Sequence, residues 1–199
     1  MRGPARLAVT MVAIVLALVA QVSVLPRMGW PDAGTGVVPG LVLLVVVATG
    51  LAQDTRFATL VGFFAGLLLD LAPPADHVAG RWALALGVVG YVVGRLSHDF
   101  QSGPGATGRR PGLGVALAAA AGGSFVGNSV FALTGVVLAD PATEFGVLLG
   151  TVLMAVAMDT LAALLVVPAM FWVTGRVAAM GSTDAGRVTP RPPARRMVL

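Results

Sequence analysis

The sequence has no cysteine, no lysine and only two histidines. The lack of cysteine excludes disulfides, thiolate nucleophiles and thiolate metal ligands, and two histidines are too few for a histidine-rich metal site. Charged residues make up only 11% of the chain, against about 25% in an average globular domain. Because so few charges cannot cover a water-facing surface, we expect the bilayer to be the solvent of this chain.

Apolar runs recur along the whole sequence. Six of them approach the length of about 20 residues that a helix needs to cross a hydrocarbon core of about 30 Å. They cover residues 7–25, 37–52, 57–72, 82–96, 113–138 and 145–174. The second, third and fourth are short, so each must borrow interfacial residues, tilt little or be shielded by its neighbours. We predict an all-α polytopic membrane protein, a compact bundle of six transmembrane helices.

The arginines predict the orientation of this bundle, because basic residues in short loops are retained in the cytoplasm. With both termini in the cytoplasm, eleven arginines lie inside and only Arg27 and Arg81 lie outside. Arg2 and Arg6 before the first run resemble a signal peptide, but no small-x-small cleavage site follows, so we expect an uncleaved first span. The net charge of +4 is spread between apolar runs, which favours topology signals over nucleic-acid binding.

Composition divides the chain into two parts. Residues 1–175 are expected to form a single six-helix transmembrane domain, with a Gly/Pro-rich cytoplasmic loop over residues 97–112. After Gly175 arginine and proline become frequent, so residues 176–199 are expected to be a flexible cytoplasmic tail. This tail would act as a retention signal that contacts anionic membrane lipid, or as a docking peptide for a partner.

Glycines at GxxxG spacing occur in four of the predicted helices. Helices in lipid gain nothing from burying leucine, and they associate through close backbone approach and interhelical hydrogen bonds. The pairs are Gly62/Gly66, Gly90/Gly94, Gly123/Gly127 and Gly146/Gly150. They indicate helix packing rather than chemistry.

Asp70 lies on the same helix face as Gly62 and Gly66, because each step of four residues turns by only about 40°. A carboxylate at this position is expected to point into the bundle near the outer interface, with Arg81 the nearest basic residue in sequence. One interpretation is a structural Asp70–Arg81 pair that closes a helical hairpin. The other is a contact between Asp70 and a ligand or partner.

Asp159 falls at the middle of the sixth run, where a carboxylate costs about 2.5–3.5 kcal/mol on the insertion scale. Asn128 on the fifth run lies at a similar depth, and Ser124 lies one turn away on the same face. An Asn128–Asp159 hydrogen bond would hold the two helices together or line a cavity for a solute or proton. A protonated Asp159 is the third alternative.

Two intramembrane aspartates invite comparison with the intramembrane aspartyl proteases. The local sequences LLLDL and VAMDT lack the GxGD surroundings of those enzymes, and the two carboxylates are predicted at different depths. We therefore expect no catalytic site, no metal site and no cofactor, and we assign no role to His77 or His98.

A longer motif runs from Pro39 to Arg95. It contains a proline before the second run, GF-x-x-GLL-x-DL at the end of the third, a short loop, and GY-x-x-G in the fourth. Its main positions are Pro39, Gly62, Phe63, Gly66, Asp70, Gly80, Arg81, Gly90, Tyr91 and Gly94. This pattern of 57 residues resembles the rod shape-determining protein MreD family. Beyond this stretch the likeness is one of size and topology.

The resemblance implies a non-enzymatic scaffold of the bacterial inner membrane that supports cell shape and side-wall peptidoglycan synthesis. Its implied partners are an MreC-like protein and, with it, MreB, RodA and a class B transpeptidase. Asp70 and the glycine faces would shape a groove for a partner's transmembrane helix or juxtamembrane segment.

The family's fold is also similar to the substrate-binding subunits of energy-coupling-factor vitamin transporters. The alternative function is therefore a solute-binding membrane subunit, in which the same region is a pocket. With one tyrosine, three tryptophans and few polar residues in the spans, the chain offers little to recognise a vitamin. This composition favours the scaffold.

Overall fold

We describe the protein from a computed structural model, which places residues 3–28, 38–73, 78–102, 111–138 and 145–185. Every regular element in these ranges is a helix, which confirms the all-α prediction. The α-helices are α1 (Gly3–Val19), α2 (Leu41–Ala52), α3 (Thr55–Leu71), α4 (Arg81–Ser102), α5 (Leu113–Val137) and α6 (Phe145–Ala185). A π-helical turn (Ala20–Val24) and a 3₁₀ turn (Leu25–Met28) extend α1.

Three of the helical stretches are long and apolar enough to cross a membrane. They are Pro4–Arg27, Leu113–Val137 and Leu148–Ala179. Each keeps most of its surface outside the protein core, as expected for helices that face lipid. Among the described residues, α2 contacts all three of these stretches, whereas α3 contacts only the first and α4 only the second.

The short helix α2 lies at the centre of the molecule. Its sequence is apolar on all sides, which is typical of a helix without a solvent-facing stripe. Every residue from Val42 to Leu51 is buried, and α2 contacts each of the other five α-helices. With 12 residues it is about 18 Å long, whereas the 25 residues of α5 reach about 37 Å. Neighbouring helices therefore shield this short helix along nearly all of its length.

The start of α2 differs from the sequence prediction, which began this span at residue 37. Pro39 has no N–H group, and Gly40 has a non-helical backbone, so the helix begins at Leu41. Pro39 is buried, and its carbonyl accepts a hydrogen bond from the N–H of Leu41 at 3.0 Å. The first turn of α2 therefore lies inside the bundle, where the N–H of Gly40 contacts Asp159 of α6.

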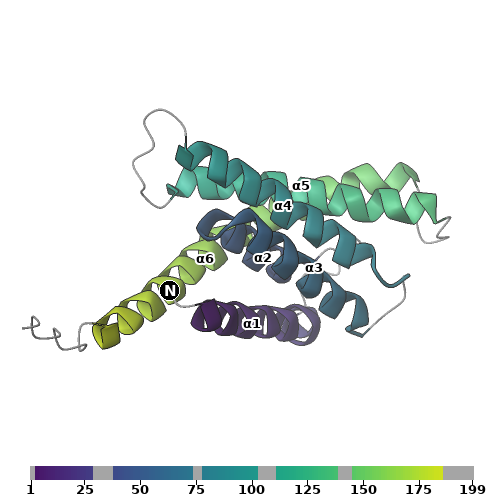
Figure 1. The fold of residues 1–199 in the computed structure, drawn as a ribbon. Helices are drawn as coiled ribbons and strands as arrows, with labels where there is room; N and C mark the ends of the chain where they lie inside the picture. The colour runs from purple at the N-terminus through teal and green to yellow at the C-terminus, as the bar shows by residue number, and fades with distance from the viewer. Residues whose placement is uncertain (1–2, 29–37, 74–77, 103–110, 139–144, 186–199) are drawn as a thin grey trace, which may run out of the picture.

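The last helix is longer than predicted. The sixth run was expected to end at residue 174 and the tail to begin at 176, but α6 continues through Ala185. The residues that follow Gly175 include several good helix formers, and the first proline of the tail comes only at Pro190. Residues 186–199 lie outside the described part of the chain. In Figure 1 the C-terminal part of α6 leads away from α5.

The bundle has two ends, each of which we name after a charged residue that lies there, Arg6 or Asp70. At the Arg6 end, Thr10 of α1, Gln53 after α2 and Thr174 of α6 line one small cavity. At the Asp70 end, Arg81 at the start of α4 contacts Phe131 of α5. The helix α1 contacts α2, α3 and α6 but, within the described residues, neither α4 nor α5, so it lies along one side of the bundle (Figure 1).

Candidate functional site

The glycines of the motif join α3 and α4 into a tight hairpin. A side chain at Gly62 would overlap the backbone carbonyl of Leu86, and one at Gly66 would overlap that of Trp82. The packing is reciprocal, because a side chain at Gly90 would overlap the backbone of Ala58. Backbone meets backbone along this hairpin, and only glycine leaves room for it.

This arrangement corrects the predicted groove. The glycine faces of α3 and α4 are filled by each other, so Gly62, Gly66, Gly90 and Gly94 do not line an open surface for a partner's helix. The GxxxG spacing predicted close helix packing. It did not indicate that the two helices that pack together, α3 and α4, both belong to the same motif.

The aromatic residues of the motif lie on the outside of the hairpin. Phe63 is 45% exposed and Tyr91 is 54% exposed. Phe63 also meets the ring of Phe64 edge-on, with ring centroids 5.7 Å apart. The surface that the motif offers to other molecules is therefore aromatic and apolar.

The remaining GxxxG pairs behave differently from each other. A Cβ atom at Gly123 would lie 2.8 Å from Val47 Cγ2, and one at Gly127 would lie 3.0 Å from Leu43 Cδ1. This pair therefore packs α5 against α2. Gly150 of α6 has open space around it, and Gly146 lies outside the residues whose packing is described.

Asp70 caps the helix that follows it. It is only 2% exposed, and its carboxylate accepts hydrogen bonds from the N–H groups of Gly80 (2.8 Å), Trp82 (3.1 Å) and Ala83 (3.0 Å). Trp82 and Ala83 lie in the first turn of α4 and Gly80 directly precedes it, where N–H groups have no partner within the helix. Gly80 has a φ of +99°, a backbone conformation that favours glycine. The carboxylate and the turn thus close the hairpin together.

Arg81 ties this end of the hairpin to α5. Its guanidinium donates a hydrogen bond to the carbonyl of Phe131 at 2.9 Å and lies 4.0 Å from the centroid of the Phe131 ring. The ring of Trp82 stacks on the same phenylalanine, with centroids 4.4 Å apart. One of the two interpretations of the sequence was an Asp70–Arg81 pair that closes the hairpin. The three N–H groups that Asp70 holds lie on either side of Arg81, and the arginine extends the closure to a third helix.

Asp159 performs a similar task for α2. It is 2% exposed, and it accepts a hydrogen bond from the N–H of Gly40 at 2.6 Å and another from the hydroxyl of Ser124 at 2.5 Å. The N-terminus of a helix carries partial positive charge, so a carboxylate stabilises it. One side chain therefore links α2, α5 and α6.

Asn128 reaches Asp159 only through Ser124. Its amide donates hydrogen bonds to the Ser124 carbonyl at 2.9 Å and to the Ser124 hydroxyl at 3.2 Å. The direct Asn128–Asp159 bond considered from the sequence is therefore replaced by a chain of two bonds. The hydroxyl of Ser124 accepts from the amide and donates to the carboxylate, which a serine side chain can do at the same time.

Gln21 completes the capping of α2. Its side-chain oxygen accepts a hydrogen bond from the N–H of Val42 at 3.0 Å. Gln21 lies in the π-helical turn that follows α1. Sequence reasoning missed this contact because α1 and α2 had no predicted register. The sequence did offer one signal for this contact, because Gln21 is an isolated amide side chain within an apolar run.

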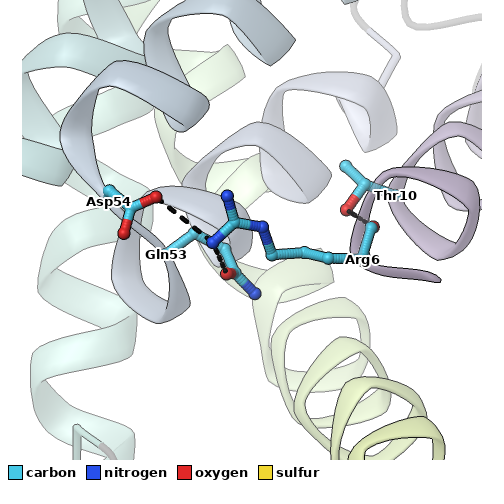
Figure 2. A network of polar contacts seen from close by, with 4 residues as sticks. All are labelled: Arg6, Thr10, Gln53 and Asp54. Carbon is cyan, nitrogen blue, oxygen red and sulfur yellow. Dashed lines mark hydrogen bonds and ion pairs between the residues drawn. The ribbon is translucent and has the colours of Figure 1, made fainter. Parts of the chain in front are cut away.

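A second contact missed from the sequence holds the other end of α1. Arg6 Nη1 lies 3.2 Å from Gln53 Oε1 and 3.2 Å from Asp54 Oδ2 (Figure 2). The guanidinium also lies over the ring of Phe57, 4.2 Å from its centroid. Thr10 donates its hydroxyl to the Arg6 carbonyl at 2.9 Å. From the sequence, Arg6 was only a topology signal, yet it fastens α1 to the α2–α3 connection.

The cavity at the Arg6 end is small. It has room for about 10 Å³, which fits a single water molecule. Its polar lining comes from Thr10, Thr49, Gln53 and Thr174. Binding sites for small molecules are usually some hundreds of Å³, so this cavity does not hold a metabolite.

Carboxylates and histidines do not assemble into a metal site among the described residues. Asp70 and Asp159 bind the N-termini of different helices, α4 and α2. Comparison with known proteins adds no relative, since no family model, curated protein or solved structure matches this chain.

Proposed function

We propose that this chain is a non-enzymatic assembly protein of the bacterial inner membrane. In this proposal it supports the cell-elongation complex by binding an MreC-like protein and, with it, the enzymes of side-wall peptidoglycan synthesis. The motif between Pro39 and Arg95 suggests the family, and the geometry of the bundle supports the kind of function.

The main support for this proposal is that the buried carboxylates bind the chain's own helices. The carboxylates of Asp70 and Asp159 are both engaged by N–H groups of the chain's own helices. A solute-binding subunit needs polar groups that converge on an open pocket. Here the buried aspartates are used to build the bundle, and the large exposed side chains within the helices are mostly apolar. Such a molecule is suited to bind other membrane proteins through its outer faces.

The proposed topology has six passes with both termini in the cytoplasm. The arginine count favours it, and the contacts of the Arg6 end agree with it. The start of α1 contacts the α2–α3 connection through Arg6, and Thr174 near the end of the last apolar stretch lines the same cavity as Thr10. The first and last helices would then present their outer termini on one side of the membrane.

The second candidate is the solute-binding subunit of a transporter. One observation favours it, because α2 begins inside the bundle, and transporters often direct the N-terminus of a broken helix at an anionic substrate. In this chain Asp159 and Gln21 already occupy that N-terminus. A substrate carboxylate would have to displace a buried carboxylate, so we rank this candidate second.

Depletion and rescue test the proposal in the host cell. Loss of the chain is expected to turn rods into spheres, and the wild-type chain is expected to restore rod shape. The matched variants are Gly66→Leu, which breaks the α3–α4 contact, and Gly150→Leu, which meets open space. The first should fail to rescue and the second should succeed. Unchanged rods after depletion, together with loss of uptake of a nutrient, would favour the transporter subunit.

A further inference from the structure

The outer surface of the α3–α4 hairpin forms one continuous face, which we call the hairpin face. Its exposed members are Leu60 and Phe63 on α3 and Leu84 and Tyr91 on α4. Gly87 lies between them, since a Cβ atom there would be 3.7 Å from Phe63 Cβ. The exposed stripes of the two helices therefore adjoin, and the surface is lower at Gly87, which has no side chain.

Tyr91 places a polar group on this face. Its ring is 54% exposed, and within the described residues its hydroxyl has no hydrogen-bond partner. Side chains on a helix lean toward the helix N-terminus, so the ring points away from Arg95 and toward the middle of the span. A hydroxyl without a partner in hydrocarbon is costly. The molecule that covers this face must therefore offer a hydrogen-bonding group.

The face is also short. Thirteen residues separate the exposed Arg56 from Asp70 on α3, and thirteen separate Arg81 from the exposed Arg95 on α4. This distance is about 20 Å along the helices, compared with about 30 Å of hydrocarbon. An ordinary transmembrane helix would extend well beyond the face, whereas a second copy of the hairpin has the same length.

Charges at the Arg6 end of the face are self-complementary. Arg95 and Asp99 lie on the same exposed stripe of α4, with Arg95 Nε 3.6 Å from Asp99 Oδ2. When two such stripes lie side by side in parallel, each arginine can reach the aspartate of the other copy. A stripe with charges of one sign would repel its copy instead.

We propose that the hairpin face binds a second copy of this chain, related by a two-fold axis along the membrane normal. Near that axis the two Tyr91 hydroxyls meet and hydrogen-bond to each other, since a hydroxyl both donates and accepts. Leu84 and Phe63 of each copy pack around this contact. The dimer goes beyond the proposed function, because an assembly protein can act as a monomer.

Single-cysteine crosslinking in native membranes tests the dimer, and the chain is suited to it because it contains no cysteine of its own. Leu84→Cys and Val88→Cys place a thiol on the face at two positions. Phe125→Cys and Leu133→Cys are the matched controls, because these exposed residues lie on α5. Under mild oxidation we expect a disulfide-linked species of twice the monomer mass from the α4 positions only.

Tyr91→Phe in the Leu84→Cys background tests the hydroxyl contact. Hydrogen bonds between helices in membranes are modest, so we expect the crosslinked fraction at a limiting protein-to-lipid ratio to fall by about three- to tenfold. An unchanged fraction would overturn the role of Tyr91. Monomer from both α4 positions, equal crosslinking from α5, or an adduct of any other mass would overturn the dimer.

The same Tyr91→Phe variant separates this proposal from the proposed function. If the two contacts are independent, the variant is expected to retain an MreC-like partner on purification while its crosslinked fraction falls. If the wild-type chain forms the dimer but purifies without an MreC-like partner, the proposed function is contradicted and the dimer is not.

Discussion

The α3–α4 hairpin and the helix α1 are held in the bundle by different means. In the hairpin, glycines allow the backbones of the two helices to touch at several successive turns. In α1, polar side chains near both ends make the specific contacts, with Arg6 bound to Gln53 and Asp54 and Gln21 bound to the N-terminus of α2. The middle of α1 exposes large apolar side chains.

The difference shows how a membrane bundle is stabilised. Burying leucine against another helix gains little when the alternative is lipid. Two other sources of stability remain available, close backbone packing and interhelical hydrogen bonds. Close backbone packing joins α3 to α4, and hydrogen bonds from polar side chains attach α1. The hairpin should therefore fail when a side chain is added, and α1 should loosen when a polar side chain is removed.

The largest expected effect comes from adding a side chain to the hairpin. Gly62→Leu would drive atoms into the carbonyl of Leu86, and backbone cannot move aside as a flexible side chain can. Overpacking of a core typically costs about 1–3 kcal/mol, and we expect this substitution to exceed that range. The yield of folded protein in mild detergent and its thermal unfolding followed by tryptophan fluorescence would measure the loss.

Gly150→Leu is the control for this prediction, because it makes the same change in another GxxxG pair where there is open space. It should leave the yield and the unfolding temperature close to those of the wild type. An equal loss of yield and unfolding temperature in both variants would mean that the effect does not come from the close α3–α4 contact.

The next largest effect is expected at the turn of the hairpin. Asp70→Ala would leave three buried N–H groups without their acceptor. Each unsatisfied buried group costs about 1–3 kcal/mol, less where water enters, so we expect about 3 kcal/mol in total. Stability should fall and partner binding should weaken, while membrane insertion continues.

Asp70→Asn separates the charge from the shape in this experiment, since the amide keeps one acceptor oxygen. The stability of Asp70→Asn should fall between that of the wild type and that of Asp70→Ala. Asp99→Ala, which alters an exposed carboxylate, should change little. Full rescue of rod shape by Asp70→Ala, with unchanged unfolding, would contradict the capping role.

A smaller effect is expected for α1. Arg6→Ala removes one hydrogen bond and one ion pair from a partly exposed site (Figure 2), which is worth about 1 kcal/mol. Hydrogen exchange should increase in α1 while α3 and α4 remain protected. Arg27→Ala at the far end of the same span is the control. Faster exchange throughout the bundle would show that α1 is not attached independently.

The smallest effect is expected for the end of the chain. Removal of residues 186–199 leaves α6 and seven of the predicted inside arginines in place. Topology should not change, because the remaining arginines still favour the same orientation. A reporter fused after Ala185 should stay in the cytoplasm. Its appearance outside would contradict the proposed orientation.

Periodicity and composition predicted the helices well, because an apolar run of this length has few other structures available in lipid. Each of the six runs begins within four residues of the helix that forms, and α4 and α6 extend beyond their predicted ends. Two of these differences have local causes. Pro39 and Gly40 delay the start of α2, and the absence of proline directly after Gly175 lets α6 continue.

The polar contacts were harder to predict, because they depend on the relative height of helices far apart in sequence. Asp159 was correctly expected to need compensation, but Gly40 is 119 residues away. No pattern in the sequence indicates that α2 would begin beside α6. GxxxG spacing has the same limit, since Gly66 and Gly150 look alike in sequence and only the first meets another backbone.

The central claim is that the interior of this bundle serves its own architecture and that its function lies on its outer faces. Affinity purification of the tagged full chain from mild detergent, with mass spectrometry of bound proteins and bound small molecules, tests it most directly. We predict recovery of an MreC-like protein with enzymes of wall synthesis, and no small molecule in stoichiometric amount. Recovery of an ATPase module or a tightly held metabolite, without those proteins, would contradict the account.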